Sequence, residues 1–230
     1  MNSLEDYKEG KVILIDKPLE WTSFQVVNKI RWLIKQHFGI KKIKVGHAGT
    51  LDPLATGLLI LCVGKFTKKI DTYQAQVKEY TGTITLGATT PSYDLETEID
   101  QVFDYSHITS EEIKEATQQF IGKIQQQPPV FSALKKDGKR LYEYARAGEK
   151  VEIPKRLITI QEFKITNIQL PNVDFKVVCS KGTYIRSLAH DFGKALHNGA
   201  YLSALRRTKI GEFNVNESVS IEEFEKILKI

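Results

Sequence analysis

Near position 50 the chain carries a carboxylate and an imidazole in a segment with neither helical nor strand periodicity. Asp52 precedes Pro53, which biases it away from the helical conformation, and His47 lies five residues earlier. Three glycines surround them and permit a close approach of the backbone to a ligand, namely Gly46, Gly49 and Gly57. A carboxylate held in such a loop can act as a nucleophile or a general base. An Asp before Pro is also a common turn, so the loop by itself leaves both interpretations open.

Other chemistries do not fit the motifs of the chain. Gly64 and Lys65 are followed by Phe66, where a Walker A phosphate-binding loop needs Ser or Thr. The zinc-protease pattern His-Glu-x-x-His is absent. His190 and His197 lie seven residues apart with no third ligand in view, so we interpret them as surface or packing residues. We therefore expect no metal and no cofactor.

The loop around Asp52 needs rigid elements to hold it. An uninterrupted apolar run, Leu58–Val63, follows the loop and predicts a buried strand that anchors it. A second strand is predicted over Lys11–Asp16. A capping box at Thr22 and Gln25 then starts a helix that Gly39 can close. A buried element that carries an irregular polar loop is the usual way to position catalytic groups.

The rest of the chain alternates strand and helix patterns. Period-two alternation predicts a strand over Lys78–Gly87, and a capping box at Thr109 predicts a helix that runs to Ile121 and closes at Gly122. Arg186 lies near the start of a predicted helix, where the macrodipole disfavours a cation, which indicates a paired or functional arginine. The remaining predicted elements are strands at Val151–Pro154, Leu157–Phe163 and Asp174–Cys179, and helices at Thr183–Leu196 and after Ser220.

Composition indicates an ordinary globular protein with a basic bias. The 230 residues are 41% hydrophobic and 27% charged, and the net charge is +5, which suits a polyanionic partner. No apolar run reaches 18 residues and the N-terminus lacks a signal-peptide core, so we expect no membrane span and a cytoplasmic location. Cys62 and Cys179 both lie in apolar runs and are expected to be reduced and buried.

One segment concentrates the basic charge. Lys135–Arg156 holds eight basic and four acidic residues, interleaved with Leu141, Tyr142 and Tyr144. Basic residues mixed with aromatic ones suit phosphate contacts and base stacking. A solvated charged surface explains the same pattern equally well.

The loop segment Gly46–Pro53, followed by Ala55–Gly57, resembles the signature motif of the TruB family of tRNA pseudouridine synthases. The resemblance extends from about Gly10 to Phe224. The further segments that match motifs of this family are Lys17-Pro18, Lys78–Tyr80, Gly87–Asp94, Pro128–Arg146, Cys179–Arg186 and Leu205–Thr208.

The resemblance implies roles for individual residues. The catalytic residues would be Asp52, Tyr80 and Arg186, with Arg186 paired to Asp52 and keeping it ionised. The substrate-binding residues would be His47, Tyr80, Tyr184, Leu205 and Lys17. The RNA-binding residues would be Lys135, Lys136, Arg140, Arg146, Arg206 and Arg207. Strand preference alone would instead make Tyr80 a core aromatic residue.

The resemblance also implies a fold and a function. The fold would be α+β, with a central mixed, largely antiparallel sheet, flanking helices and a catalytic cleft. A single catalytic domain would span residues 1–230, with an RNA-gripping insertion at about 125–150 and no C-terminal PUA domain. The protein would be an isomerase that converts uridine to pseudouridine at position 55 in the T-arm of tRNA. It would act as a monomer and require no protein partner.

Two functions from other classes remain as alternatives. An RNA-binding module without catalysis would account for the basic aromatic segment, but a carboxylate near phosphates adds nothing to RNA affinity. A nucleoside hydrolase for small substrates would use Asp52 but would not need the long basic segment that begins at Lys135. Mapping of pseudouridine in tRNA transcripts incubated with the protein would separate these possibilities.

Overall fold

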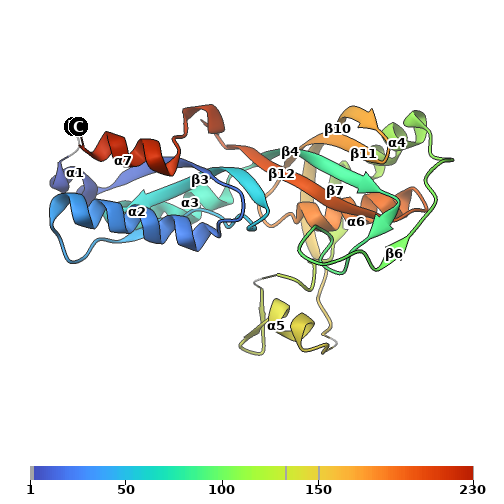
Figure 1. Cartoon of the computed structure of the whole chain (residues 1–230), viewed down its shortest axis with the longest axis horizontal. Coiled ribbons are helices and arrows are strands. Elements are labelled where there is room, and N and C mark those ends of the chain that lie inside the picture. Colours follow the sequence, from blue (N-terminus) through green and yellow to red (C-terminus); the bar gives the residue numbers. More distant parts are fainter. Residues whose placement is uncertain (1–2, 133, 150, 230) are drawn as a thin grey trace. The chain divides into compact units, whose positions relative to one another are not determined.

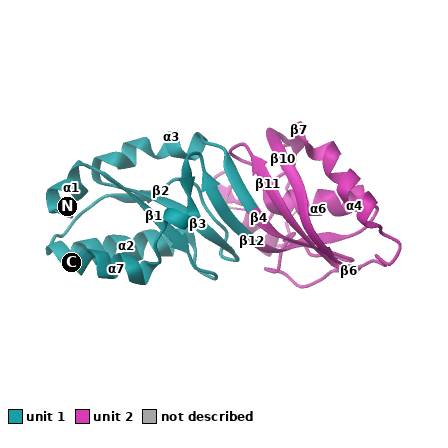
Figure 2. Cartoon of the chain, turned by 90° about the horizontal axis from the view of Figure 1, so that it is seen from above, with its two compact units in different colours: residues 1–80, 205–230 teal, residues 81–204 magenta. Residues whose placement is uncertain are grey.

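The computed structural model describes residues 3–132, 134–149 and 151–229 (Figure 1). The chain divides into two compact units (Figure 2). Unit 1 comprises residues 1–80 and 205–230, and unit 2 comprises residues 81–204. Two long strands, β4 (Lys78–Leu86) and β12 (Ala200–Ile210), contribute residues to both units. No helix in the described part of the chain is both long and apolar enough to cross a membrane.

Unit 1 contains a mixed sheet. Its strands follow the order β1 (Lys11–Lys17), β3 (Ala55–Val63) and β12. β1 is antiparallel to β3, whereas β12 runs parallel to β3. Two short strands, β2 (Val45–His47) and β13 (Phe213–Asn214), pair antiparallel with β3 and β12 respectively. β3 therefore pairs with β1, β2 and β12, and β13 joins the sheet through β12.

Helices cover both faces of β3, as Figure 2 shows for α2 (Ser23–Phe38) and α7 (Ile221–Lys229) on one side and α3 (Ile70–Ala75) on the other. Leu59, Leu61 and Val63 belong to the core cluster beneath α2 and α7, and Leu58, Ile60 and Cys62 belong to the opposite one. Burial on both faces explains the uninterrupted apolar run of this strand. The other helical segments of unit 1 are α1 (Leu4–Glu9), η1 (Gly64–Lys69) and η3 (Val215–Glu217).

Unit 2 is built on antiparallel strands. β10 (Arg156–Gln169) pairs with β11 (Asn172–Cys179) on one side and with β7 (Gly122–Gln126) on the other. Phe163 on β10 meets Phe192 of α6 (Ile185–Ala195) with ring centroids 5.4 Å apart, which packs this helix against the sheet. The smaller elements are β5 (Ala88–Thr89), β6 (Gln101–Val102), α4 (Ser110–Ala116), η2 (Thr117–Phe120), β8 (Lys135–Lys136), β9 (Lys139–Arg140) and α5 (Leu141–Arg146).

The structure confirms the α+β class, the mixed and largely antiparallel sheet, and most expected elements. The predicted strand at Val151–Pro154 is wrong, because this segment forms no ladder and Pro154 has no N–H to donate. The helix expected to run to Ile121 ends at Ala116 and continues as a 3-10 turn. The hydroxyl of Thr117 bonds the carbonyl of Lys114, and such a bond competes with regular helix.

Candidate active site

Asp52 lies in the loop of residues 48–54 between β2 and β3, called here the Asp52 loop. Its position is fixed at the neighbouring residue, because the hydroxyl of Ser23 accepts from Leu51 N at 2.8 Å and donates to Leu51 O at 3.1 Å. Ser23 and Leu51 are both buried, so water does not compete for these bonds. Asp52 O accepts from Ala55 N at 3.1 Å, which turns the chain directly into β3. The first turn of α2 and the start of β3 thus hold the backbone on both sides of the Asp52 side chain.

The buried Arg207 side chain bonds the backbone of the same loop. Its side chain is 1% exposed, and Nε donates to Leu58 O at 2.8 Å. Its Nη2 and Nη1 donate to the carbonyl oxygens of Gly49 at 3.1 Å and Thr50 at 3.5 Å. A Cβ at Gly57 would lie 2.3 Å from the carbonyl oxygen of Arg207, so only glycine permits β12 to approach so closely. This buried place does not fit the predicted phosphate contact of Arg207 and makes it a positioning residue instead.

Lys17 is buried beside the Asp52 loop. Its ammonium donates to the carbonyl oxygens of Pro18 at 2.8 Å, Trp21 at 2.6 Å and Pro53 at 3.3 Å. Burial lowers the pKa of Lys17 to about 8, the charge of Asp52 opposes this shift, and the charge of Arg207 adds to it. The opposing effect of Asp52 shows that the charge of this carboxylate acts on the Lys17 ammonium. Its bond to Pro53 O ties Lys17 to the Asp52 loop. The substrate-binding role of Lys17 stays a prediction.

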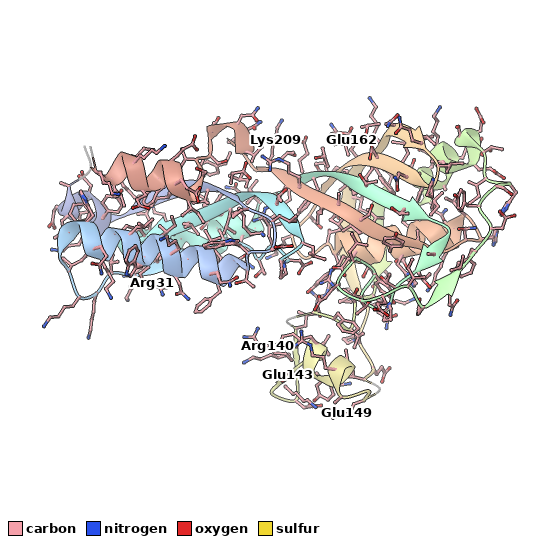
Figure 3. All side chains as sticks on the ribbon, in the orientation of Figure 1. Arg31, Arg140, Glu143, Glu149, Glu162 and Lys209 are labelled. Carbon is pink, nitrogen blue, oxygen red and sulfur yellow. The ribbon has the colours of Figure 1, made fainter. Side chains whose placement is uncertain are left out.

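His47 is the last residue of β2, and β2 is attached to α2 because Arg31 Nη2 donates to Val45 O at 2.9 Å (Arg31 is labelled in Figure 3). Burial lowers the pKa of His47, the charge of Arg207 lowers it further, and a backbone hydrogen bond with Gly49 opposes the shift. The lowered pKa favours a neutral imidazole at physiological pH.

The remaining predicted residues of unit 1 lie on β4 and β12. Tyr80 is 9% exposed within β4. Leu205 is paired with Ala55, directly after the Asp52 loop. Arg206 forms a bidentate ion pair with Asp16, at 3.0 and 2.6 Å, and remains partly exposed. Unit 1 therefore brings His47, Lys17, Leu205 and Arg206 to the elements that carry Asp52.

Arg186 lies in unit 2, at the second residue of α6, with its side chain 4% exposed. Its Nε lies 3.5 Å from Asp94 Oδ2, and Nη1 donates to Ser92 O at 3.2 Å. The carboxylate of Asp94 offsets the unfavourable placement of a cation at a helix start. The pairing indicated by the sequence is present, with Asp94 as a partner. The pair predicted between Arg186 and Asp52 joins residues of different units and stays a prediction.

Tyr184 occupies the N-cap position of α6. Its backbone N–H donates to Gln126 Oε1 at 2.8 Å, and its carbonyl accepts from Gln126 Nε2 at 3.0 Å. The guanidinium of Arg156 lies 5.9 Å from the centroid of the Tyr184 ring, within the range of a cation–π contact. The tyrosine is thus held through its backbone from β7.

The predicted RNA-gripping residues lie in a segment here named the lobe, residues 128–152, of which residues 133 and 150 are outside the described part. Lys135 is exposed on β8, and Lys136 Nζ donates to Glu152 O at 2.9 Å. Two arginines flank the ring of Tyr142, with Arg140 at 5.9 Å and Arg146 at 5.4 Å from its centroid. In Figure 3 Arg140 is labelled beside α5. This cluster of cations around an aromatic ring suits single-stranded RNA.

Comparison with known proteins decides the family. The family described as TruB family pseudouridylate synthase (N terminal domain) matches residues 35–185, and the tRNA pseudouridylate synthase B C-terminal domain matches residues 186–230. The chain belongs to the TruB family. It is 63% identical to tRNA pseudouridine synthase B of Flavobacterium johnsoniae, over 98% of this chain and 99% of the relative. It is 56% identical to tRNA pseudouridine synthase B of Phocaeicola vulgatus, over 95% and 93% of the two chains.

A solved structure agrees with this assignment. In the crystal structure of a Cbf5-Nop10-Gar1 complex, one chain is 28% identical to this one, with a TM-score of 0.70. The match covers 96% of this TruB family chain and 54% of that chain. This chain therefore spans about half the length of that structural relative.

Three contributions to this TruB family site were not predicted from sequence. Asp94 ends the segment Gly87–Asp94, whose resemblance to a family motif was the available signal. The clamp of Gln126 on Tyr184 and the buried role of Arg207 have no sequence signal, since both join residues that are far apart in the chain. Among the residues that the structure describes, no group of three or more His, Cys, Asp or Glu could hold a metal ion.

Proposed function

We propose that this protein is a tRNA pseudouridine synthase that isomerises uridine 55 in the T-arm of tRNA. The observation that carries the proposal is the 63% identity to a relative named tRNA pseudouridine synthase B over nearly the whole of both chains. The fixed Asp52 loop supports it, because the bonds of Ser23 to Leu51 and of Arg207 to Gly49 order the backbone that carries Asp52.

The reaction detaches uracil from C1′ of the ribose and rejoins it through C5. The target base must leave the RNA stack, because its reacting atoms are otherwise out of reach. Asp52 acts as the nucleophile or base at the ribose or the uracil, and Lys17 lies beside the loop that carries it. Tyr80 stacks on the base, and Arg186 supports the charge of Asp52. His47 fills space beside the displaced base as a neutral imidazole.

The lobe grips the RNA in this proposal. Lys135, Arg140 and Arg146 contact phosphates, and Tyr142 offers an aromatic ring whose centroid lies 5.9 and 5.4 Å from two guanidinium groups. Arg206 adds a partly exposed cation next to the loop that carries Asp52. We expect the protein to work as a monomer without a protein partner. Its tRNA substrate places it in the cytoplasm.

The test is incubation of the protein with unmodified tRNA transcripts, followed by chemical mapping of pseudouridine. We expect modification at position 55 by the wild type and none by Asp52→Asn, which should retain its fold and its tRNA affinity. Release of free uracil would instead indicate a hydrolase. Tight tRNA binding with no change in the RNA would indicate a binding module. Turnover by Asp52→Asn near the wild-type rate would remove Asp52 from the chemistry.

A further inference from the structure

The first turn of α6 carries Tyr184 and Arg186, yet its N-cap residue makes no side-chain capping bond of its own. Gln126, the last residue of β7, instead bonds the backbone of this N-cap residue. Its Oε1 accepts from Tyr184 N at 2.8 Å and its Nε2 donates to Tyr184 O at 3.0 Å. Gln126 is 1% exposed, so water cannot replace these bonds. A single amide thus fixes both backbone groups of Tyr184.

The next residue, Gln127, joins the same turn to the base of the lobe. Ser187 Oγ, also buried, donates to Gln127 O at 2.7 Å. The side chain of Gln127 makes a separate bond, in which its Nε2 donates to Ile153 O at 3.1 Å. Gln127 and Ile153 flank the lobe on either side. The two ends of the lobe are therefore bonded to each other and to the turn that carries Arg186.

These contacts suggest more than the capping of a helix. An N-terminal capping bond joins a side-chain acceptor to a free N–H of the first turn, whereas Gln126 bonds both the N–H and the carbonyl of Tyr184, and this carbonyl also accepts from Leu188 N at 3.1 Å. Arg186 is held on the same turn by Asp94 and by Ser92 O. The turn is thus fixed from two directions, by β7 and by the 92–94 segment. Its position follows that of the strand that leads into the lobe.

We propose that Gln126 and Gln127 form a junction that sets Tyr184 and Arg186 in register with the lobe, so that RNA gripped by the lobe meets both side chains correctly placed. This inference rests on the proposed function. Gln126 is a positioning residue in it and touches no substrate atom. Loss of the clamp lets the first turn of α6 shift, and a shift of about 1 Å near reacting groups can cost about 100-fold in rate.

The test compares Gln126→Met with Gln125→Met in single-turnover assays at saturating tRNA. Met keeps the length of Gln126 but lacks both the amide oxygen and the amide nitrogen, and Gln125 is an exposed neighbour on the same strand. We expect Gln126→Met to lower the rate by roughly 10- to 100-fold. Its Kd for tRNA and the salt dependence of Kd should match the wild type, because the lobe is untouched. Gln125→Met should change neither quantity.

A second variant covers the case in which Gln126→Met does not fold. Ser187→Ala removes only the bond to Gln127 O and should also lower the rate while Kd stays unchanged. Wild-type rates in the variants that fold would overturn the inference, as would a loss of affinity in proportion to the loss of rate. A wild-type protein that makes no pseudouridine would refute the proposed function instead, so the two failures are distinguishable.

Discussion

Ser23 offers the sharpest test of how the loop that carries the proposed catalytic residue Asp52 is held. Ser23→Ala removes the hydroxyl that bonds both the N–H and the carbonyl of Leu51, the residue before Asp52. The substitution leaves Asp52 itself intact. It also leaves α2 able to start, because the capping box of Thr22 and Gln25 is unchanged.

The size of the effect follows from burial. Ser23 is 2% exposed and Leu51 is 4% exposed, so the N–H of Leu51 would lose its partner with no water to replace it. A buried donor left without a partner costs about 1–3 kcal/mol. For a protein of this size each kcal/mol lowers Tm by about 2–4 °C, so we expect a loss of roughly 2–12 °C. The freed loop should also lower the single-turnover rate by roughly 10- to 100-fold.

The assay pairs thermal unfolding with single-turnover pseudouridine formation at saturating tRNA. Thr109→Ala is the matched control, because it removes the capping hydroxyl of α4 in unit 2 and should cost about 1 kcal/mol without touching the Asp52 loop. Thr109→Ala should lower Tm and leave the rate unchanged, whereas Ser23→Ala should lower both. A Ser23→Ala protein that loses stability but keeps the wild-type rate would refute the claim that this contact positions Asp52.

Three further predictions concern other parts of the site. Tyr80→Ala and Arg186→Ala should each lower the single-turnover rate far more than tRNA affinity, and a loss of affinity at unchanged rate would make them binding residues only. Lys135→Ala combined with Lys136→Ala should raise Kd and reduce the slope of log Kd against log salt by about one unit per lost phosphate contact, while a T-arm stem-loop remains a substrate; an unchanged slope would exclude these lysines from the RNA interface. Burial lowers the pKa of Lys17 from 10.5 to about 8, so between these pH values the unfolded chain binds a proton that the folded chain has lost. The free energy of unfolding should therefore rise with pH across that window by up to about 3 kcal/mol relative to Lys17→Met, and parallel pH curves for the two proteins would contradict the shift.

Local patterns in the sequence were enough to predict much of the frame around the site. The capping boxes at Thr22, Thr109 and Ser220 start helices where expected, and Gly39 closes α2 in the left-handed conformation. The apolar run of β3 is a strand buried on both faces. These features depend on residues close together in the chain, so a pattern can reveal them.

Contacts between distant residues could not be predicted in the same way. Gln126 meets Tyr184 across 58 positions of the chain, and Arg207 meets Leu58 across 149. Neither pair has a spacing that a local pattern could detect. The only sequence signal for the pairing of Arg186 with Asp94 was that the segment ending at Asp94 resembles a family motif. The charge pattern alone pointed to no specific carboxylate.

Arg206 and Arg207 show why charge in a sequence does not identify an RNA surface. They are adjacent, equally basic, and were both predicted to bind RNA. On a strand, however, successive side chains point to opposite faces. Arg206 points outward, pairs with Asp16 and remains partly exposed, whereas Arg207 is buried against the carbonyls of Gly49 and Leu58. The guanidinium carries several N–H donors on one planar cation, which could bind a phosphate. In Arg207 these donors instead bind backbone oxygens and fix the Asp52 loop. Which of the two roles an arginine takes is decided by the face of β12 on which it falls, and the sequence of two consecutive arginines carries no information about that choice.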